Sequence, residues 1–342
     1  MTHATSTQIR LAQRPHGWPT GDDFTVARVD LDDLAPGEVR VANEFVSVDP
    51  YMRGRMNDVR SYVPPYALGD VIAGGAIGRV VATASDDLPV GTIVLHQHGW
   101  SDVVQADAAT FRAVPDLPGV PLSVRLHILG MTGLTAYVGL TAIANLQPGD
   151  TVFVSGAAGA VGTAVGQIAK LLGAGRVIGS AGSDEKVALL TEKYGYDAAF
   201  NYKDAPVRRQ LAEHAAGGVD VFFDNVGGDH LEAALDVMNT GGRIALCGAI
   251  AGYNTTEKTP GPDNLSNMIT RGLTATGFTL AAYLHLSPEF GEKMTAWFTE
   301  GRIAYDETIV DGIEHAVDAF LAMMQGANTG KMLVRVGASD AS

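Results

Sequence analysis

Residues 151–186, TVFVSGAAGAVGTAVGQIAKLLGAGRVIGSAGSDEK, constrain the fold of this chain more than any other segment. A short apolar run rich in β-branched residues is followed by Gly156, Gly159 and Gly162, and then by apolar residues at helical spacing. This order predicts a strand, a tight turn and a helix, and a second strand over 176–180 completes a βαβ unit. A glycine turn before a helix can approach a pyrophosphate closely and offer free N–H groups to its charge. The segment therefore predicts a dinucleotide site, although GxxGxxG turns also occur for packing alone.

The end of the second predicted strand indicates which cofactor the site prefers. NAD sites usually carry Asp or Glu about 20 residues after the glycine turn, where the carboxylate binds the ribose 2′-OH. Here residues 180–182 are uncharged, and Ser183 and Lys186 offer a hydroxyl and a cation that suit the 2′-phosphate of NADPH. Alternatively, Ser183 is only a helix N-cap and Lys186 a solvated lysine. Asp184 and Glu185 could be a displaced NAD-type acid, but we interpret them as partners of the helix dipole.

Length, charge and cysteine content limit the classes of protein that fit. At 342 residues the chain is long for one hydrophobic core, so two domains are expected. A formal net charge of −14 repels nucleic acid and anionic membranes, so we expect neither as a partner. Cys247 is the single cysteine, which excludes an intrachain disulfide and a cysteine cluster for structural zinc. The sequence has no secretion signal and no apolar run of about 20 residues, which predicts a cytoplasmic protein.

The hydrophobic period changes along the chain. Residues 9–115 consist of short alternating or apolar runs separated by turn residues, which predicts a β-rich domain, a small barrel. Residues 122–146 have a helical period, and from residue 151 strands and helices alternate. This alternation predicts a parallel sheet with helices on both faces and ligands at the carboxyl ends of its strands. The tail after residue 303 adds a helix and a strand that such a sheet does not need, so we expect it to return to the β-rich domain.

Eight blocks of sequence, in the same order, resemble the zinc-independent medium-chain reductases. The nearest branch is that of the prostaglandin/leukotriene reductases and related NADPH-dependent alkenal and curcumin reductases. The blocks are DPYMRGRM (49–56), GMTGLTAYVGL (130–140), SGAAGAVGTAVGQIAK (155–170), AGSDEK (181–186), FNYK (200–203), DNVGG (224–228), GRIALCGAIAGYN (242–254) and GANTGKMLV (326–334).

This resemblance implies both a fold and a reaction. The fold is α/β, with a GroES-like β-barrel domain over residues 1–125 and 304–342 and a Rossmann domain with a doubly wound parallel sheet over residues 126–303. The reaction is the NADPH-dependent reduction of a C=C bond conjugated to a carbonyl group. The substrate is then a small alkenal or enone, and the resemblance also implies a homodimer.

The resemblance assigns cofactor contacts to positions that match the family's motifs. The pyrophosphate turn is Ala160, Val161, Gly162 and Thr163. Lys186 matches the 2′-phosphate lysine, and Tyr202 matches a tyrosine near the adenosine phosphate. The other contacts are Asn225, Cys247, Gly248, Ala249, Ile250, Tyr253, Phe278, Thr279, Leu280 and, near the nicotinamide, Asn328. The sequence departs from the family at Gly156 and Ala158, where relatives often carry Ala and Ser, and this affects only a minor turn contact.

Reduction of an enone requires a group that stabilises the developing enolate. Hydride addition to the β-carbon leaves negative charge on the carbonyl oxygen, so a hydrogen-bond donor near that oxygen lowers the barrier. Tyr253, which follows a predicted strand end, is the first catalytic candidate and Tyr51 is the second, because both match tyrosines that line the substrate pocket of the family. By position alone, Tyr253 could be a packing residue and Tyr51 could simply wall the pocket. The proton for the α-carbon could come from Tyr253, a ribose hydroxyl or water.

We expect no metal site. Zinc alcohol dehydrogenases of this fold use Cys and His ligands early in the chain, whereas no cysteine precedes Cys247 and no histidine lies between His16 and His96. His96 and His98 alternate on a predicted strand, but two histidines are more often a packed or solvated pair than a metal site. Cys247 itself falls within the apolar strand RIALCG and is expected to be a buried, unreactive thiol.

The sequence therefore predicts an NADPH-dependent 2-alkenal or enone reductase that works without metal. Within enzymes, the alternative is an NADPH-dependent quinone reductase, which shares the hydride donor and the fold. From another class, the chain could bind NADPH without turnover, as a sensor or a structural component.

Overall fold

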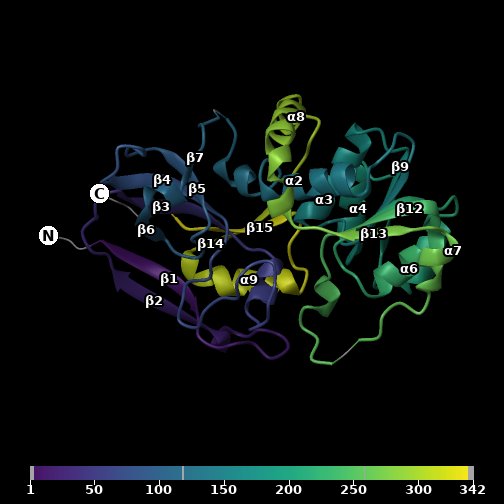
Figure 1. Ribbon diagram of the computed structural model, residues 1–342, viewed down its shortest axis with the longest axis horizontal. Helices are drawn as coiled ribbons and strands as arrows, with labels where there is room; N and C mark the ends of the chain where they lie inside the picture. The colour runs from purple at the N-terminus through teal and green to yellow at the C-terminus, as the bar shows by residue number, and fades with distance from the viewer. Residues whose placement is uncertain (1–3, 118, 258, 338–342) are drawn as a thin grey trace. The chain divides into compact units, whose positions relative to one another are not determined.

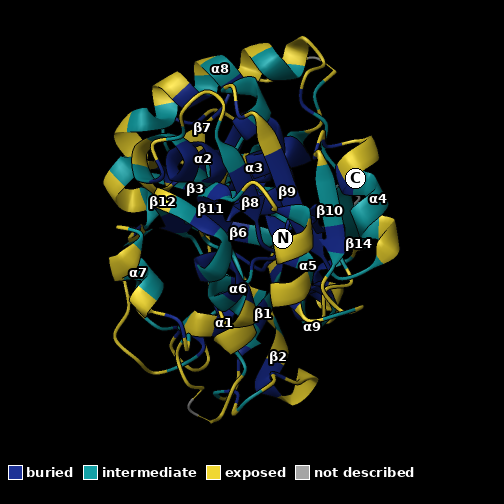
Figure 2. Cartoon of the chain, turned by 90° about the vertical axis from the view of Figure 1, so that its right-hand side faces the viewer, coloured by how far each residue is buried: buried dark blue, intermediate teal, exposed yellow. Residues whose placement is uncertain are grey.

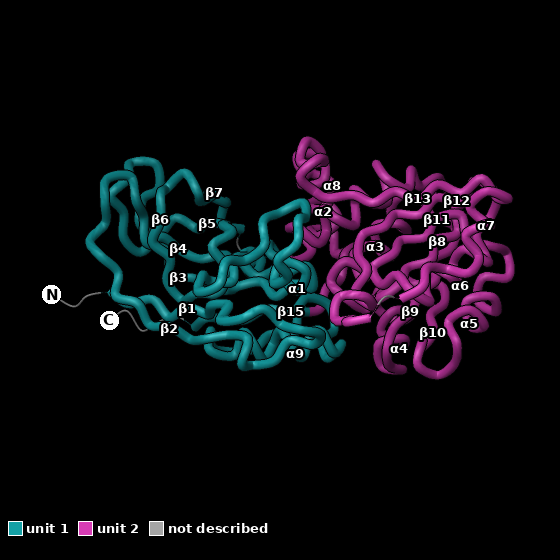
Figure 3. Tube along the Cα trace, turned by 60° about the horizontal axis from the view of Figure 1, so that its bottom comes forward, with its two compact units in different colours: residues 1–126, 307–342 teal, residues 127–306 magenta. Residues whose placement is uncertain are grey.

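The computed structural model describes residues 4–117, 119–257 and 259–337. The chain divides into two compact units, shown in different colours in Figure 3. Unit 1 combines Met1–Leu126 with Glu307–Ser342, and unit 2 is His127–Asp306. Within the described ranges, no helix has the length and apolar character needed to cross a membrane.

Unit 2 is built on a six-stranded sheet in which every neighbouring pair of strands is parallel. The strands are β8 (Thr151–Val154), β9 (Arg176–Ala181), β10 (Ala198–Asn201), β11 (Val219–Asp224), β12 (Met238–Leu246) and β13 (Thr274–Gly277). They lie in the order β10-β9-β8-β11-β12-β13; β9, β12 and β13 are labelled in Figure 1. By position along the chain this is the order 3-2-1-4-5-6 of dinucleotide-binding sheets. The expected Rossmann arrangement is confirmed.

Helices cover both faces of this sheet. Because β9 and β12 lie on opposite sides of the pair β8 and β11, right-handed crossovers place α3 and α6 on opposite faces. Helix α3 packs with α2, and α6 packs with α5 and α7. The helices of unit 2 are α2 (Met131–Val138), α3 (Ala160–Leu171), α4 (Asp184–Glu192), α5 (Val207–His214), α6 (Asp229–Val237), α7 (Ser266–Thr270) and α8 (Ser287–Thr299).

Aromatic side chains fill the core of unit 2. The ring of Phe153 stacks on those of Phe222 and Phe200, with centroids 5.0 and 6.0 Å apart. All three side chains are buried, and each such burial contributes roughly 1.5–3 kcal/mol. Figure 2 shows the strands β8, β9 and β11 in the dark blue of buried residues, whereas α7 and α8 carry exposed residues. The sheet is therefore a rigid support for the loops at its strand ends.

The helical pattern expected over residues 122–146 is confirmed only in part, because the helical segments are short and interrupted. The structure has a 3₁₀ turn at Leu122–Leu126, then α2, then one π-helical turn at Gly139–Ile143. Before α2 the chain bends, and the carbonyl of His127 accepts hydrogen bonds from the N–H groups of Gly130 and Gly133. A Cβ atom on Gly133 would lie 2.0 Å from the carbonyl oxygen of Ile128. The glycines that fit the helical period thus serve a tight turn.

Unit 1 contains most of the antiparallel structure. Strands β1 (Thr5–Leu11) and β2 (Phe24–Asp30) form a two-stranded sheet. A seven-stranded sheet has the path β14-β15-β3-β4-β5-β7, with β6 paired to β3. Its strands are β3 (Glu38–Ser47), β4 (Ala76–Thr83), β5 (Ile93–His96), β6 (Val103–Asp107), β7 (Arg112–Ala113), β14 (Glu307–Asp311) and β15 (Lys331–Arg335). Helices α1 (Tyr51–Arg55) and α9 (Ala316–Met324) complete the unit.

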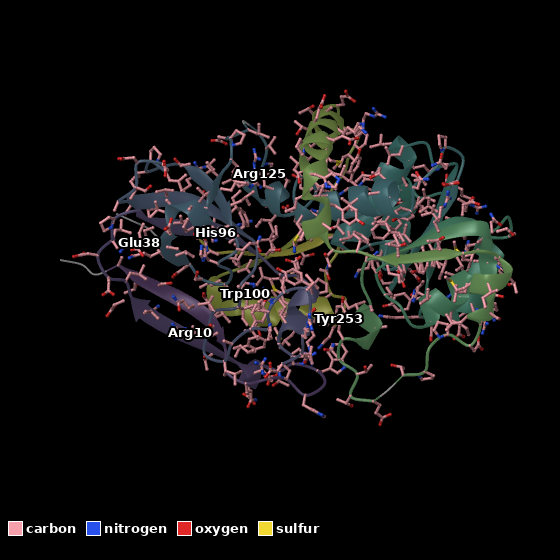
Figure 4. All side chains as sticks on the ribbon, in the orientation of Figure 1. Arg10, Glu38, His96, Trp100, Arg125 and Tyr253 are labelled. Atoms are coloured by element: carbon pink, nitrogen blue, oxygen red, sulfur yellow. The ribbon has the colours of Figure 1, made fainter. Side chains whose placement is uncertain are left out.

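The C-terminal segment is part of the large sheet of unit 1. Strand β15 pairs antiparallel with β3, so that Leu333 lies opposite Ser47. Next to this pairing, the fully buried Trp100 donates its indole N–H to the carbonyl of Ser47 over 2.9 Å (Figure 4). The Trp100 ring also packs against Phe24 and Phe320, at centroid distances of 6.4 and 5.9 Å. Segments from both ends of the chain therefore share one core.

Candidate active site

The strand order of unit 2 places the switch point of the sheet between β8 and β11, where doubly wound sheets form their ligand crevice. The chain leaves β8 toward β9 on one side and leaves β11 toward β12 on the other. The loops that follow these two strands therefore diverge at the carboxyl edge of the sheet. Ligands of doubly wound sheets bind at such a switch point. Residues 155–159 and 225–228 form its two walls.

The glycine turn after β8 is constrained by packing and leads into a helix start without a side-chain cap. A Cβ atom on Gly162 would lie 2.5 Å from the carbonyl oxygen of Ala157, and Gly156 has a φ of 59°. Packing therefore explains these two glycines. Helix α3 begins at Ala160 after Gly159, and no side chain caps its first turn. The N–H groups of Ala160, Val161 and Gly162 thus mark a helix start that can bind an anion.

Asp224, at the end of β11, organises the loops of the crevice. Its carboxylate is buried and accepts hydrogen bonds from the hydroxyl of Ser155 (2.8 Å) and from two N–H groups of the following turn (3.0 and 2.9 Å). Its backbone carbonyl accepts the N–H groups of Cys247 (2.9 Å) and Gly248 (3.0 Å). Burial raises the pKa of this carboxyl group. Sequence reasoning placed Asp224 only at a strand end, because Ser155, Cys247 and Gly248 are distant from it in the chain.

Asn225 connects the same loops from within the crevice. Its side-chain amide donates to the carbonyl of Ser155 over 2.8 Å, and its own carbonyl accepts the N–H of Ile250 over 3.4 Å. The side chain of Asn225 is half-buried. The structure therefore brings this predicted cofactor contact next to the glycine turn.

Three predicted cofactor contacts meet around Gly182, at the end of β9. Ser183 caps α4 and accepts the N–H of Lys186. The N–H of Tyr202 donates to the carbonyl of Ala181 over 3.0 Å. The Tyr202 hydroxyl lies 2.8 Å from the position a Cβ atom on Gly182 would take. Ser183 is therefore an N-cap that directly follows Gly182, the Tyr202 hydroxyl lies over Gly182, and Lys186 is in the first turn of α4.

Electrostatics at this end of the sheet favour an anion. Burial, and secondarily the charge of Lys203, lower the pKa of the half-buried Lys186 ammonium. Two cations that repel each other are stabilised when a dianion binds between them. The neighbouring acids have local partners: Asp184 accepts the amide of Asn201 over 2.9 Å. Hydrogen bonds from its own backbone N–H and from the Ser183 side chain lower the pKa of the Glu185 carboxyl group.

Tyr253 lies in the loop that follows β12 (Figure 4). It comes directly after the 3₁₀ turn Ile250–Gly252, and its hydroxyl accepts the N–H of Ala249 over 3.4 Å. The side chain is half-buried, and burial raises the pKa of its phenol. The phenol therefore stays protonated near neutral pH and can donate a hydrogen bond.

Cys247 lies just past β12, so the expectation that it is inside the strand is wrong. The strand ends at Leu246 because the next two N–H groups both donate to the carbonyl of Asp224. Cys247 is half-buried rather than buried, and burial and then the charge of Asp224 raise the pKa of its thiol to about 12. The N–H groups of Cys247 and Gly248 are thus used to shape the crevice.

The last group of unit 2 candidates follows β13. Phe278 comes directly after the strand, and its half-buried ring packs edge-on against those of Phe223 and Tyr283, at 6.5 and 6.4 Å. Thr279 and Leu280 follow it and are also half-buried. These three residues extend the carboxyl edge of the sheet beyond β12.

Two predicted residues, Tyr51 and Asn328, belong to unit 1. Tyr51 is the first residue of α1, and burial, followed by the charge of Asp49, raises the pKa of its phenol. Asn328 lies in the loop before β15 and donates its amide to the carbonyl of Gly330 over 2.8 Å. Tyr51 is therefore protonated at neutral pH and can act as a donor.

A buried ion pair holds the start of α1. The Lys331 ammonium donates to the Asp49 carboxylate over 2.8 Å and to the carbonyl of Val48 over 2.7 Å. The side chains are 1% and 5% exposed, and the Ser47 hydroxyl donates to the other carboxylate oxygen of Asp49. Sequence reasoning missed this pair because its members are 282 residues apart.

His96 and His98 form a packed pair. The Nε2 of His96 lies 2.8 Å from the side-chain oxygen of Asn43, and its Nδ1 accepts the N–H of His98 over 3.2 Å. This arrangement requires the neutral imidazole with its proton on Nε2. Among the residues that the structure describes, no group of three or more His, Cys, Asp or Glu side chains could hold a metal ion. The absence of a metal site remains a prediction.

We expect His96→Gln to flatten the dependence of stability on pH. Burial, and secondarily the charge of His98, lower the pKa of His96 from 6.5 to about 3. The unfolded state therefore binds a proton below pH 6.5 that the folded state excludes, so stability falls as pH falls from 6.5 toward 3. Between pH 7 and 4.5 this group removes about 2–3 kcal/mol of unfolding free energy.

Urea unfolding of the wild type and His96→Gln at both pH values measures this term. The difference in unfolding free energy between the two pH values should be smaller in the variant than in the wild type, whatever the variant's stability at pH 7. The exposed His16→Gln is the matched control and should keep the wild-type difference. An unchanged difference in His96→Gln would show that His96 is not kept neutral by the fold.

Comparison with known protein families divides the chain in the same order. Residues 7–114 match a family described as the N-terminal domain of oxidoreductase. Residues 160–300 match a family described as zinc-binding dehydrogenase.

Individual relatives align with nearly the whole chain. The NADPH-dependent curcumin reductase of Escherichia coli (strain K12) is 39% identical over 335 residues, covering 96% of this chain and 96% of the relative. The NADP⁺-dependent 2-alkenal reductase of Nicotiana tabacum is 39% identical over 335 residues, covering 96% and 97%. The crystal structure of CurA from Vibrio vulnificus in complex with NADPH has a TM-score of 0.91 and 39% identity, and the match covers 98% of this chain and 100% of that chain.

Proposed function

We propose that this chain, which belongs to the zinc-independent branch of the medium-chain dehydrogenases/reductases that contains the alkenal reductases, reduces C=C bonds conjugated to a carbonyl group with NADPH. The observation that carries the proposal is the cluster at the end of β9. There Ser183 caps α4 directly after Gly182, the Tyr202 hydroxyl lies over Gly182, and Lys186 is in the first turn of α4. The neighbouring Asp184 accepts a hydrogen bond from Asn201. The relatives named above use NADP cofactors and include a 2-alkenal reductase.

The residues at the carboxyl edge of unit 2 fit a phosphorylated dinucleotide. The uncapped start of α3 suits the pyrophosphate, and the loops fixed by Asp224 form the wall beyond it. At the other end, Lys186 supplies the cation for the 2′-phosphate, with Ser183 and Tyr202 as hydroxyl donors. We assign the remaining cofactor contacts to the residues expected from the sequence, which are Thr163, Asn225, Cys247, Gly248, Ala249, Ile250, Tyr253, Phe278, Thr279, Leu280 and Asn328.

The protein's own contribution to the reaction is electrostatic stabilisation of the charge that develops on the substrate. When bound, NADPH supplies the hydride that adds to the β-carbon of the substrate. Tyr253, protonated because burial raises its pKa, donates a hydrogen bond to the carbonyl oxygen on which negative charge develops. Tyr51 is the second donor that we assign to the substrate. Neither role requires a metal ion.

An assay of the purified chain with NADPH or NADH and a panel of 2-alkenals, enones and quinones tests the proposal. We expect NADPH oxidation with alkenals and enones and formation of the saturated carbonyl product, with slower turnover of NADH. Faster turnover of quinones than of enones would instead identify a quinone reductase. NADPH binding without turnover of any member of the panel would identify a cofactor-binding protein without catalytic activity.

We also propose that the chain is a cytoplasmic homodimer. Strand β13 is the edge of the parallel sheet, and three of its four residues are exposed. An open edge can pair with a second copy. The apolar side chains of Leu265, Ile269 and Leu284 are also exposed in the segments that flank β13. Sedimentation equilibrium should give twice the mass of one chain; a monomer mass at micromolar concentration would contradict the dimer.

A further inference from the structure

His230 is a buried histidine that the proposed chemistry does not use. It is the second residue of α6, is 5% exposed, and its N–H donates to the carbonyl of Gly227 over 3.1 Å. Its Nε2 is buried and has no hydrogen-bond partner among the described residues. Leaving such a nitrogen unsatisfied costs about 1–3 kcal/mol, so a contact of the imidazole ring must offset this cost.

The ring of His230 packs edge-to-face against Tyr202. Their centroids are 5.5 Å apart and the ring planes meet at 78°. Tyr202 is 38% exposed, while its ring packs on the buried His230. On the other side, the Tyr202 hydroxyl lies over Gly182, 2.8 Å from where a Cβ atom would be. The imidazole and the glycine together limit where the phenol can point.

We infer that His230 is a positioning residue for the 2′-phosphate end of the cofactor site: it holds the Tyr202 phenol over Gly182, next to the N-cap Ser183, and so contributes to the preference for NADPH over NADH. This inference rests on the proposed function. Burial lowers the pKa of His230 to about 4, so the imidazole is neutral near pH 7. It therefore acts through the placement of Tyr202 and adds no charge to the site.

The experiment measures NADPH and NADH dissociation constants by fluorescence titration for the wild type and a set of variants. In His230→Leu, the loss of one edge-to-face contact should weaken NADPH by about 3- to 10-fold and change NADH by less than about 2-fold. His230→Phe restores a ring without the nitrogen and should recover most of the NADPH affinity. A general packing defect would change the affinities for both cofactors. Recovery of NADPH affinity alone in His230→Phe therefore identifies the positioning role.

Two further variants make the result specific. His214→Leu is the matched control, because His214 stacks at 5.6 Å on Phe200 of the same unit, which is not a predicted cofactor residue. It should leave the ratio of the two constants unchanged. In a Tyr202→Leu background, His230→Leu should have almost no additional effect on NADPH, because the partner through which it acts is gone.

The outcomes separate the inference from the proposed function. If the wild type fails to bind NADPH more tightly than NADH, the proposed cofactor preference fails. Two results would overturn the inference about His230 while the wild-type preference, and with it the proposed function, stands. In the first, His230→Leu weakens the binding of NADPH and NADH equally. In the second, His230→Leu weakens NADPH binding as much in the Tyr202→Leu background as in the wild type.

Discussion

Lys186→Ala weakens NADPH binding by about 10- to 150-fold and leaves NADH binding within about 3-fold, since a hydrogen bond to a charged group contributes roughly 1.5–3 kcal/mol. The extra phosphate of NADPH is the part that distinguishes the two cofactors. Lys186 is half-buried beside Ser183 and Tyr202, so water screens its charge less than it would on an open surface. The loss should therefore fall on the phosphorylated cofactor.

Titration of cofactor fluorescence at two salt concentrations measures the effect. The NADPH affinity of the wild type should fall more steeply with salt than that of Lys186→Ala. Lys193→Ala is the matched control, because Lys193 follows the other end of α4 and binds Asp306 over 2.6 Å. It should leave the ratio of the two affinities unchanged. An equal loss for NADPH and NADH in Lys186→Ala would mean that the lysine does not meet the 2′-phosphate.

The parts of unit 2 that sequence predicts well are those with local signals. The βαβ unit, the N-cap at Ser183 and the strand ends follow from hydrophobic period and from turn residues within a few positions. To predict the order of the strands, only one further rule is needed, namely that crossovers are right-handed. For this reason the carboxyl edge of the sheet, and hence the candidate site, is readable before any coordinates are known.

Features built from distant residues are the ones that sequence misses. The carboxylate of Asp224 bonds Ser155, 69 residues away, and Asp49 bonds Lys331 across 282 residues. Nothing near either residue signals its partner. His230 fits the start of a helix, and only the fold brings its ring to Tyr202. The interruptions in the helical segment predicted over residues 122–146 have a different cause. The glycines there fit a helical period, but Gly133 is required by a close approach of the backbone.

Tyr253→Phe lowers turnover of an enone by about 10²- to 10³-fold and preserves NADPH binding, which is the loss typical when one donor to a developing oxyanion is removed. The phenol is half-buried and protonated, and its only described hydrogen bond is the long one from Ala249. Its proton is therefore available to a substrate oxygen. The phenylalanine keeps the ring and removes the donor, so the cofactor loops after β12 should stay in place.

Steady-state kinetics with saturating NADPH, together with a cofactor titration, separate this role from a packing role. A packing role would weaken NADPH binding along with turnover, whereas loss of an enolate donor lowers kcat and spares the cofactor. Tyr137→Phe is the control, because its hydroxyl binds Glu289 over 2.6 Å and is remote in sequence from the strand ends. Wild-type turnover in Tyr253→Phe would remove the proposed role of Tyr253. Tyr51 would then be the donor to test, since burial keeps its phenol protonated as well.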